Sequence, residues 1–242
     1  MAELDDRERT ESPTPKRLED ARKKGQVARS RDLSAAAVTL AGGLGLYSTG
    51  QLFGGHLLEL MRGSMTFSRA DATVPERMIE VLGTVSLEAA LASAPLLGLL
   101  LAAAVLAPLM LGGWTFSTSS MAPDLTRLDP VAGLGRVFSL NGLIEVLKSL
   151  ARFALVALVA VLVLRHQFRD FTSLGAAPVR AGIGQALSLC GQAFLWLGGA
   201  LGLIAMIDVP LALWQHHRRL KMSRQEIRDE SKETDGNPEV RG

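Results

Sequence analysis

The sequence predicts an all-α integral membrane protein with four long hydrophobic helices, arranged as two helical hairpins joined by a cytosolic loop. Residues 33–58, 89–123 and 181–207 contain no charged residue, and residues 153–164 are purely apolar. A helix needs roughly 20 consecutive apolar residues to cross the hydrocarbon core of a bilayer. The positions of Lys and Arg are the second observation, because they are concentrated on one side of the predicted spans.

The first two helices form the predicted hairpin 33–111. Residues 33–58 are rich in glycine, which leaves room for a partly interfacial position. Pro75 suits the first turn of the second helix, which is expected to reach residue 111. At 1.5 Å per residue this helix would be about 55 Å long, against a bilayer core of about 30 Å. It must therefore project, break or bend, and Pro95 and Pro108 are the expected places.

The second hairpin is predicted over residues 144–212. Its first helix must extend backward from the apolar run, because 153–164 is only about half the length of a span. Glu145, Lys148 and Arg152 then share one helix face, which we expect to point at protein and not at lipid. A buried core helix of a soluble protein is the alternative for each run, and it is a stronger alternative for this segment than for 89–111 or 181–207.

The distribution of positive charge predicts the orientation. Of the 26 Lys and Arg residues, 20 lie in residues 1–31, in residues 112–152 or after His216, and six lie in the two outer segments. Four spans with both termini and the central loop in the cytosol fit this bias. The predicted parts are a basic N-terminal segment (1–32), the first hairpin (33–111, with 59–88 on the outer side), a cytosolic loop (112–143), the second hairpin (144–212) and a linker helix (213–242).

Two short helices are predicted in the polar segments. Thr14 and Pro15 are typical of a helix start, and Gly25 of a C-terminal cap, so residues 15–24 should be helical. This basic helix either lies near anionic headgroups or is a solvated flank. Ser223 and Glu226 have the spacing of a capping box, which predicts a tail helix that ends at residues 236–238.

The central loop carries more large apolar residues than a solvated connection needs. Exposed apolar clusters of this kind mark contact with a partner or a membrane. A re-entrant or interfacial helix that packs on its own protein is the alternative. The candidate partner-contacting residues are Leu125, Leu128, Pro130, Leu134, Arg136 and Phe138.

Asp208 is the other candidate site, because a carboxylate at membrane depth needs a partner. It lies at the cytosolic end of the fourth helix, level in an antiparallel hairpin with Lys148 and Arg152 at the start of the third. We expect Asp208 to pair with one of these cations or to reach a neighbouring subunit. Simple hydration at the headgroup level is the alternative.

The sequence offers no constellation for catalysis, metal or cofactor binding. The four histidines and Cys190 lack metal-ligand spacing, and no Walker Lys follows a glycine-rich turn. The pair Gly43 and Gly45, and the GxxxG of Gly198 and Gly202, are interpreted as helix packing. A net charge of +2, with basic and acidic residues interleaved, argues against nucleic acid as a partner.

Several of these segments carry a resemblance to one family. Residues 9–32 (RTESPTPKRLEDARKKGQVARSRD), 128–139 (LDPVAGLGRVFS) and 220–233 (LKMSRQEIRDESKE) resemble motifs of the FlhB family of flagellar export-gate proteins and their virulence-secretion relatives. The sequences of residues 113–117 and 222–226 resemble the flagellar branch of the family more than the virulence branch. The resemblance implies a subunit of the type III protein export apparatus in the bacterial inner membrane, with gate subunits, exported flagellar proteins and the bilayer as partners. It also implies a central loop around the cytosolic mouth of the gate.

The chain departs from the family pattern at its end. Family members carry a C-terminal domain that cuts itself in an Asn-Pro-Thr-His sequence, whereas Asn237-Pro238 is followed here by Glu239-Val240. We therefore expect this chain to lack the self-cleaving centre and not to be an enzyme. A small multi-span transporter of solutes or ions is the alternative function, and a membrane-bound enzyme is the third class. Transporters concentrate ionisable groups near the bilayer midplane, whereas here those groups gather at the span ends.

Overall fold

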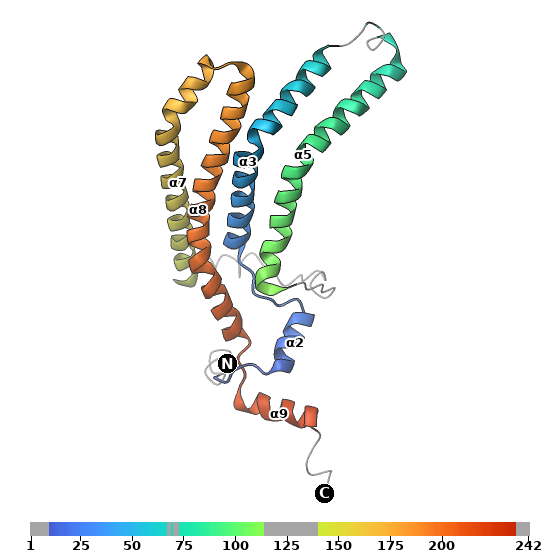
Figure 1. The fold of residues 1–242 in the computed structure, drawn as a ribbon. Coiled ribbons are helices and arrows are strands. Elements are labelled where there is room, and N and C mark those ends of the chain that lie inside the picture. The colour runs from blue at the N-terminus through green and yellow to red at the C-terminus, as the bar shows by residue number, and fades with distance from the viewer. Residues whose placement is uncertain (1–9, 67–68, 70–72, 114–139, 236–242) are drawn as a thin grey trace. The chain divides into compact units, whose positions relative to one another are not determined.

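The computed structural model describes residues 10–66, 69, 73–113 and 140–235 (Figure 1). Helices dominate the described residues. In chain order the elements are α2 (Pro15–Lys23), α3 (Arg31–Met65), α5 (Pro75–Gly112), α7 (Leu140–Ser173), the short 3₁₀ helix η3 (Leu174–Ala176), α8 (Val179–Arg219) and α9 (Arg224–Asp235). The all-α prediction and all four long helices are therefore confirmed.

The chain divides into two compact units. The first unit comprises Met1–Ser30, Pro108–Pro130 and Ile207–Gly242, and the second comprises Arg31–Ala107 and Val131–Met206. The boundary falls inside α5 and inside α8, so each of these helices contributes residues to both units. Each unit is built from segments that lie far apart in the sequence.

In the second unit the long helices follow the order α7, α8, α3, α5 from one side to the other (Figure 1). Helix α3 therefore contacts a helix from each hairpin. It packs on α5 where Gly42 faces Leu100 and Gly45 faces Leu96 and Leu99. A methyl group at Gly42 would lie 3.3 Å from Leu100 Cδ2, so the missing side chain lets the two helices approach.

Helix α3 also packs on α8, and there the backbones of the two helices approach each other. Three glycines of α8 at a spacing of seven face α3: Gly184 lies against Gly54, Gly191 against Tyr47 and Gly198 against Leu40. A methyl group at Gly191 would lie 2.5 Å from the Tyr47 backbone nitrogen. A repeat of seven keeps small residues on one side of a helix over two turns, which lets two backbones run close together. We call these contacts the glycine seam.

The glycine seam confirms helix packing as the use of Gly43 and Gly198. A methyl group at Gly43 would lie 2.8 Å from the Leu195 nitrogen. Gly202, the second member of the GxxxG pattern, has no atom within 4 Å of that position. On α8 the glycines that face α3 are therefore spaced by seven residues and not by four.

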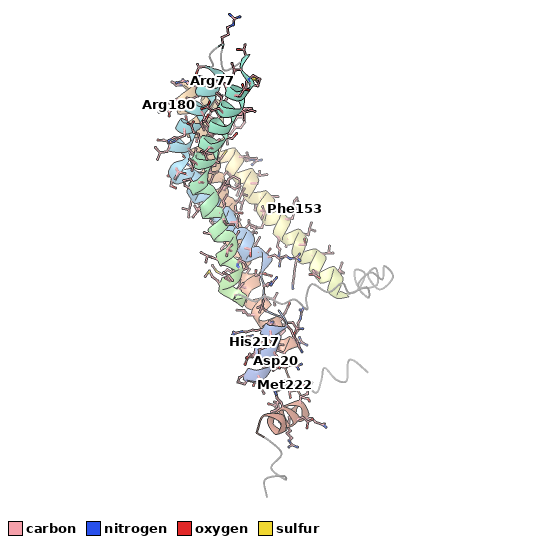
Figure 2. The ribbon with its side chains drawn as sticks, turned by 90° about the vertical axis from the view of Figure 1, so that its right-hand side faces the viewer. Asp20, Arg77, Phe153, Arg180, His217 and Met222 are labelled. Carbon is pink, nitrogen blue, oxygen red and sulfur yellow. The ribbon has the colours of Figure 1, made fainter. Side chains whose placement is uncertain are left out.

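Helices α7 and α8 are joined through η3, and a polar contact between them involves a buried side chain. Gln167 is buried, with 2% of its surface exposed, and its Nε2 donates a hydrogen bond to Gln192 Oε1 at 3.4 Å. The outer side of α7 remains apolar and exposed, as the labelled Phe153 shows in Figure 2 (72% exposed). Exposed apolar surface on this scale suits lipid or a partner protein.

Among the described residues, three helices are long and apolar enough to cross a membrane by length and composition: Pro75–Gly112, Glu145–Ala176 and Val179–Arg219. Helix α3 is outside this set, so the prediction that four helices span a membrane is not confirmed. Its glycines and its polar residues Ser48, Thr49 and Gln51 lower its hydropathy. Helix α3 packs against α5 on one side and α8 on another. Small side chains allow this close approach of helices, whereas large apolar side chains would prevent it.

The described helices extend beyond most of the predicted bounds. Helix α5 runs from Pro75 to Gly112 without a break, so Pro95 and Pro108 do not end it, and Figure 1 shows its course as curved. Helix α8 contains Pro210 and continues to Arg219, past the predicted end of the hairpin at residue 212. Proline removes one backbone hydrogen bond but does not end a helix whose neighbouring turns remain bonded.

The two short helices of the first unit form as predicted. Thr14 caps α2 by accepting a hydrogen bond from the Arg17 nitrogen at 3.2 Å, and Gly25 follows with a φ of 72°. The Ser223 backbone nitrogen donates to Glu226 Oε2 at 3.0 Å, and the Glu226 backbone nitrogen donates to Ser223 Oγ at 3.2 Å. This capping box begins α9, which ends at Asp235.

Candidate functional site

The predicted partner-contacting residues of the central loop lie outside the described residues. These are Leu125, Leu128, Pro130, Leu134, Arg136 and Phe138, within 114–139. What the structure describes is how the loop departs from α5. Gly113 has a φ of 69° and its nitrogen donates to the Leu109 carbonyl at 2.9 Å, which ends the helix as a left-handed glycine cap.

The N-terminal segment packs against this departure point. A methyl group at Gly112 would lie 2.9 Å from Val27 Cγ2 and 3.0 Å from the Ala28 carbonyl oxygen. Ala28 is itself buried, with 7% of its surface exposed. The chain between α2 and α3 therefore holds the residue from which the central loop leaves α5.

Two residues further on, the same segment contacts Asp208. The hydroxyl of Ser30 donates to Asp208 Oδ2 at 2.7 Å, and Ser30 is buried, with 5% of its surface exposed. Asp208 is partly buried and stands two residues before Pro210 in α8. A carboxylate withdrawn from water needs hydrogen-bond donors, and the Ser30 hydroxyl provides one.

Arg152 forms an ion pair with Asp32, a residue that the sequence did not indicate as its partner. Its Nη1 lies 3.0 Å from Asp32 Oδ2, and the side chain of Asp32 is 19% exposed. Asp32 is in the first turn of α3, where a negative charge also favours the helix dipole. The Ser-Arg-Asp sequence at the start of the first apolar run was the available signal, because Ser and Asp are typical of helix starts.

The predicted pair of Asp208 with Arg152 or Lys148 stays a prediction. Asp208 belongs to the first unit, and Arg152 and Lys148 belong to the second. Lys148 is exposed on α7. Two described contacts are Asp208 with Ser30, within the first unit, and Arg152 with Asp32, within the second.

The N-terminal segment also contacts the tail helix of the first unit. Glu11 and Met222 form an antiparallel backbone bridge, with both N–H···O distances at 3.1 Å. The Thr14 hydroxyl donates to Glu230 Oε2 at 2.7 Å, and Arg224 Nε lies 2.9 Å from Glu11 Oε1. We call these three contacts the tail clasp. It connects residues that are more than 200 positions apart in the sequence.

The tail clasp has a small apolar centre and a charged surround. Met222 and Leu220 are buried at 3% and 6% exposure, as is Ala21 of α2 at 4%. A hollow of about 310 Å³ lies beside them, and both Asp20 and Met222, labelled in Figure 2, line it. Its other lining residues are Lys16, Arg17, Glu226, Asp229 and Glu230. Two basic and four acidic side chains line the hollow, so both signs of charge are present.

One ion pair stabilises α2 itself. Lys23 Nζ lies 2.8 Å from Glu19 Oε1, at a spacing of four residues. The hydrogen bond and the charge of Lys23 lower the pKa of Glu19, and Glu19 in turn raises the pKa of Lys23. Glu N-terminal to Lys is the favourable order for such a pair on a helix. The pair is solvated, so its effect is local.

The chemistry available at these contacts is binding and positioning. Within the described ranges no group of three or more His, Cys, Asp and Glu side chains could hold a metal ion. The N-terminal segment instead makes three connections in succession, to the tail at Met222 and Glu230, to the start of the loop at Gly112, and to α8 at Asp208. Such an arrangement fixes the positions of connecting segments.

The sequence of this chain matches a known protein family. The family described as "FlhB HrpN YscU SpaS Family" matches residues 7–242. The chain is 36% identical over 244 residues to the "Flagellar biosynthetic protein FlhB" of Yersinia enterocolitica, covering 100% of this chain and 63% of that protein. It is 31% identical over 242 residues to the protein of the same name in Bacillus subtilis (strain 168), covering 97% of this chain and 65% of that protein. It is 29% identical over 246 residues to the "Yop proteins translocation protein U" of Yersinia pestis, covering 97% and 66%.

Proposed function

The chain belongs to the FlhB HrpN YscU SpaS family, and from this premise we propose that it is a membrane subunit of the bacterial flagellar type III protein export apparatus. The family match over residues 7–242 carries the proposal, because it includes the tail clasp, all four long helices and the central loop. The flagellar relatives match at 36% and 31% identity, against 29% for the Yersinia pestis translocation protein. The chain spans about 63% of the first of these relatives, so the activity of the whole protein is part of the proposal.

The proposed mechanism is steric. The hairpins pack on other gate subunits, and the central loop lies at the cytosolic entrance of the channel and moves when the channel opens. The exposed apolar surfaces of α5 and α7 support packing on partners, because they include Leu101, Met110, Leu147 and Phe153 at 66–83% exposure. The contact of Val27 and Ala28 with Gly112 supports a fixed base for the moving loop.

We place the protein in the bacterial inner membrane with four spans and both termini in the cytosol. The three apolar helices and the bias of Lys and Arg support this placement. Helix α3 is the proposed fourth span. Its packing between α8 and α5 supports this, because a helix enclosed by other helices needs little lipid-facing apolar surface.

In this proposal the described part of the chain is not an enzyme. It contributes position and movement, and the energy for export comes from other components. Exported flagellar proteins pass its loop as cargo. The residues that follow Asn237-Pro238 support the absence of the family cleavage sequence at that position, because they are Glu239 and Val240.

Purification in mild detergent tests the assignment to the apparatus. A tagged copy of the chain should co-elute with the other membrane subunits of the export gate from its native membrane. Replacing both Leu147 and Phe153 by Asn removes apolar contact surface on α7. This variant should still insert into the membrane, but smaller amounts of the gate subunits should co-elute with it. Recovery of the intact chain alone, with the gate subunits present in the same membranes, would contradict the proposal.

Deletion of residues 119–140 tests the role of the central loop. We expect membrane insertion to be unchanged, because the helices that insert are retained except for the first residue of α7, and secretion of flagellar proteins to stop. Export is measured as flagellar protein in the culture medium, and insertion by alkali-resistant membrane association. A deletion strain that secretes normally would show that the loop does not gate the channel.

A further inference from the structure

A groove between α3 and α5 has the features of a binding site for an amphipathic molecule. It has a volume of about 540 Å³, within the range of small-molecule sites. Residues of α3 from Thr49 to Leu60 line one wall, and residues of α5 from Glu88 to Leu96 line the other. The groove therefore lies within the first hairpin and within the second unit.

The groove is closed at one end by side-chain packing. Leu96 lies at that end, and it also packs against Gly45 of α3, where a methyl group would lie 2.5 Å from Leu96 Cδ1. A second contact, Gly42 with Leu100, continues the seal one turn further. The occupant must therefore end inside the groove. A transmembrane helix of a partner would need a channel open along the full length of the hairpin.

The groove is apolar near its closed end and charged at the other. Phe53 and Pro95 line the apolar part, with Leu52 and Leu91 exposed there at 69% and 63%. Glu59 and Glu88 line the far part together with His56. These two carboxylates also border the uncharged runs 33–58 and 89–123, so they mark the level at which the hairpin changes from apolar to polar.

The charges at this level favour a head group with an ammonium next to a phosphate. Two carboxylates attract an ammonium group and repel a free fatty acid. Arg180 of α8 supplies the opposite charge, because its Nη2 lies 3.5 Å from Glu59 Oε1. Figure 2 labels Arg180 at the same end of the second unit as Arg77 of α5. Guanidinium groups are the preferred partners of phosphate oxygens.

We propose that this groove binds a phospholipid with an amine head group, of the phosphatidylethanolamine class. One acyl chain lies against Phe53 and Leu91, the ammonium binds Glu88 and Glu59, and the phosphate binds Arg180. The inference rests on the proposed insertion of α3 and α5 into the membrane. The lipid would fill the space between α3 and α5 beside the sealed end.

Photolabelling in bilayers tests the site. The whole chain is reconstituted in vesicles of phosphatidylglycerol that contain a trace of phosphatidylethanolamine with a photoreactive group at the end of one acyl chain. We expect labelled peptides from residues 49–60 and 88–96. Labelling should be competed by unlabelled phosphatidylethanolamine at about tenfold lower concentration than by phosphatidylglycerol, the ratio expected when one charge-assisted interaction is lost.

Two substitutions with matched controls separate the head group from the acyl chain. Glu88→Gln should remove the preference for the amine lipid, whereas Glu80→Gln, at an exposed position on the same helix, should retain it. Ala92→Leu should fill the groove and reduce labelling, whereas Gly98→Leu, which adds a side chain in open space, should not.

Three outcomes would overturn the site. Equal competition by both lipids, unchanged by Glu88→Gln, would indicate ordinary annular lipid. Absence of label from both groove peptides, with label present around the exposed Trp196 of α8, would leave the membrane proposal intact and reject the groove. A photoreactive residue at position 92 that captures a gate subunit in native membranes would assign the groove to a partner helix. Absence of all labelling would instead reject insertion itself.

Discussion

At the scale of single residues, the glycine seam is the feature most sensitive to substitution. Gly191 faces the Tyr47 backbone so closely that a methyl group would lie 2.5 Å from its nitrogen. Backbone atoms cannot move aside as the end of a flexible side chain can. Alanine is normally favoured over glycine inside a helix by about 1 kcal/mol, so the sign of the effect reports on the packing.

We predict that Gly191→Ala destabilises the protein by about 1–3 kcal/mol, the cost of overpacking a close contact. Gly202→Ala is the matched control, because nothing lies within 4 Å of its methyl position, and it should be neutral or stabilising. The thermal midpoint in detergent, followed by tryptophan fluorescence, measures both. Equal effects of the two substitutions would show that α3 and α8 do not approach in this way.

The ion pair of Asp32 with Arg152 gives a second prediction at this scale. Asp32→Arg and Arg152→Asp should each lower the thermal midpoint, because each places two like charges 3.0 Å apart in a partly buried site. The double variant should recover part of the loss. If the double variant recovered none of the loss, the direct pair of Asp32 with Arg152 would be excluded.

At the scale of elements, the tail clasp connects two short helices that could not persist alone. Helix α2 has 9 residues and α9 has 12, whereas isolated helices shorter than about 12–15 residues are marginal in water. The sequence identified both helices because caps are local signals. It could not reveal that Thr14, the cap of α2, also donates to Glu230 of α9, since no local pattern relates positions so far apart.

Thr14→Ala should therefore weaken both helices and not only its own. We expect a loss of about 1–2 kcal/mol from the cap and faster amide hydrogen exchange in residues 15–23 and also in 224–235. Thr14→Ser retains the hydroxyl and should leave exchange almost unchanged. If exchange accelerates in α2 alone, the hydroxyl serves only as a cap and the clasp does not transmit stability.

At the scale of the molecule, the two predicted hairpins are joined more closely to each other than the sequence suggested. Contacts of Gly54 with Gly184, Tyr47 with Gly191 and Leu40 with Gly198 follow one antiparallel register along α3 and α8. The first and fourth helices therefore form the centre of the second unit, with α5 and α7 outside. This arrangement leaves the apolar faces of α5 and α7 for lipid or partners.

A disulfide cross-link tests this register. The methyl position of Gly50 lies 3.1 Å from Leu187 Cβ. A small shift would bring the two Cβ atoms to the roughly 3.5–4.5 Å that a disulfide requires. With Cys190 replaced by Ser, the pair Gly50→Cys and Leu187→Cys should oxidise readily. A protease site inserted within 114–139 then allows the chain to be cut into two halves. On a denaturing gel the two halves should migrate as one band until the disulfide is reduced. The pair Gly63→Cys and Leu187→Cys should separate, because Gly63 faces open space.

The sequence by itself determined the elements of this protein. Long uncharged runs, helix caps and the positions of Lys and Arg are local or additive properties, so they yielded the helical class, the four long helices and the two short ones. Asp208 and Arg152 were recognised as residues in need of partners for the same reason, since a charge at an apolar boundary is a local feature.

Only the tertiary structure decided which elements meet. Glycine has no side chain, so its role in packing depends on what approaches it, and Gly191 and Gly202 look alike until α3 is placed beside one of them. The Ser30 and Asp32 contacts depend in the same way on a chain segment returning to α8 and α7. Contacts between distant segments are set by the shape of the whole, and no periodicity within one segment encodes them.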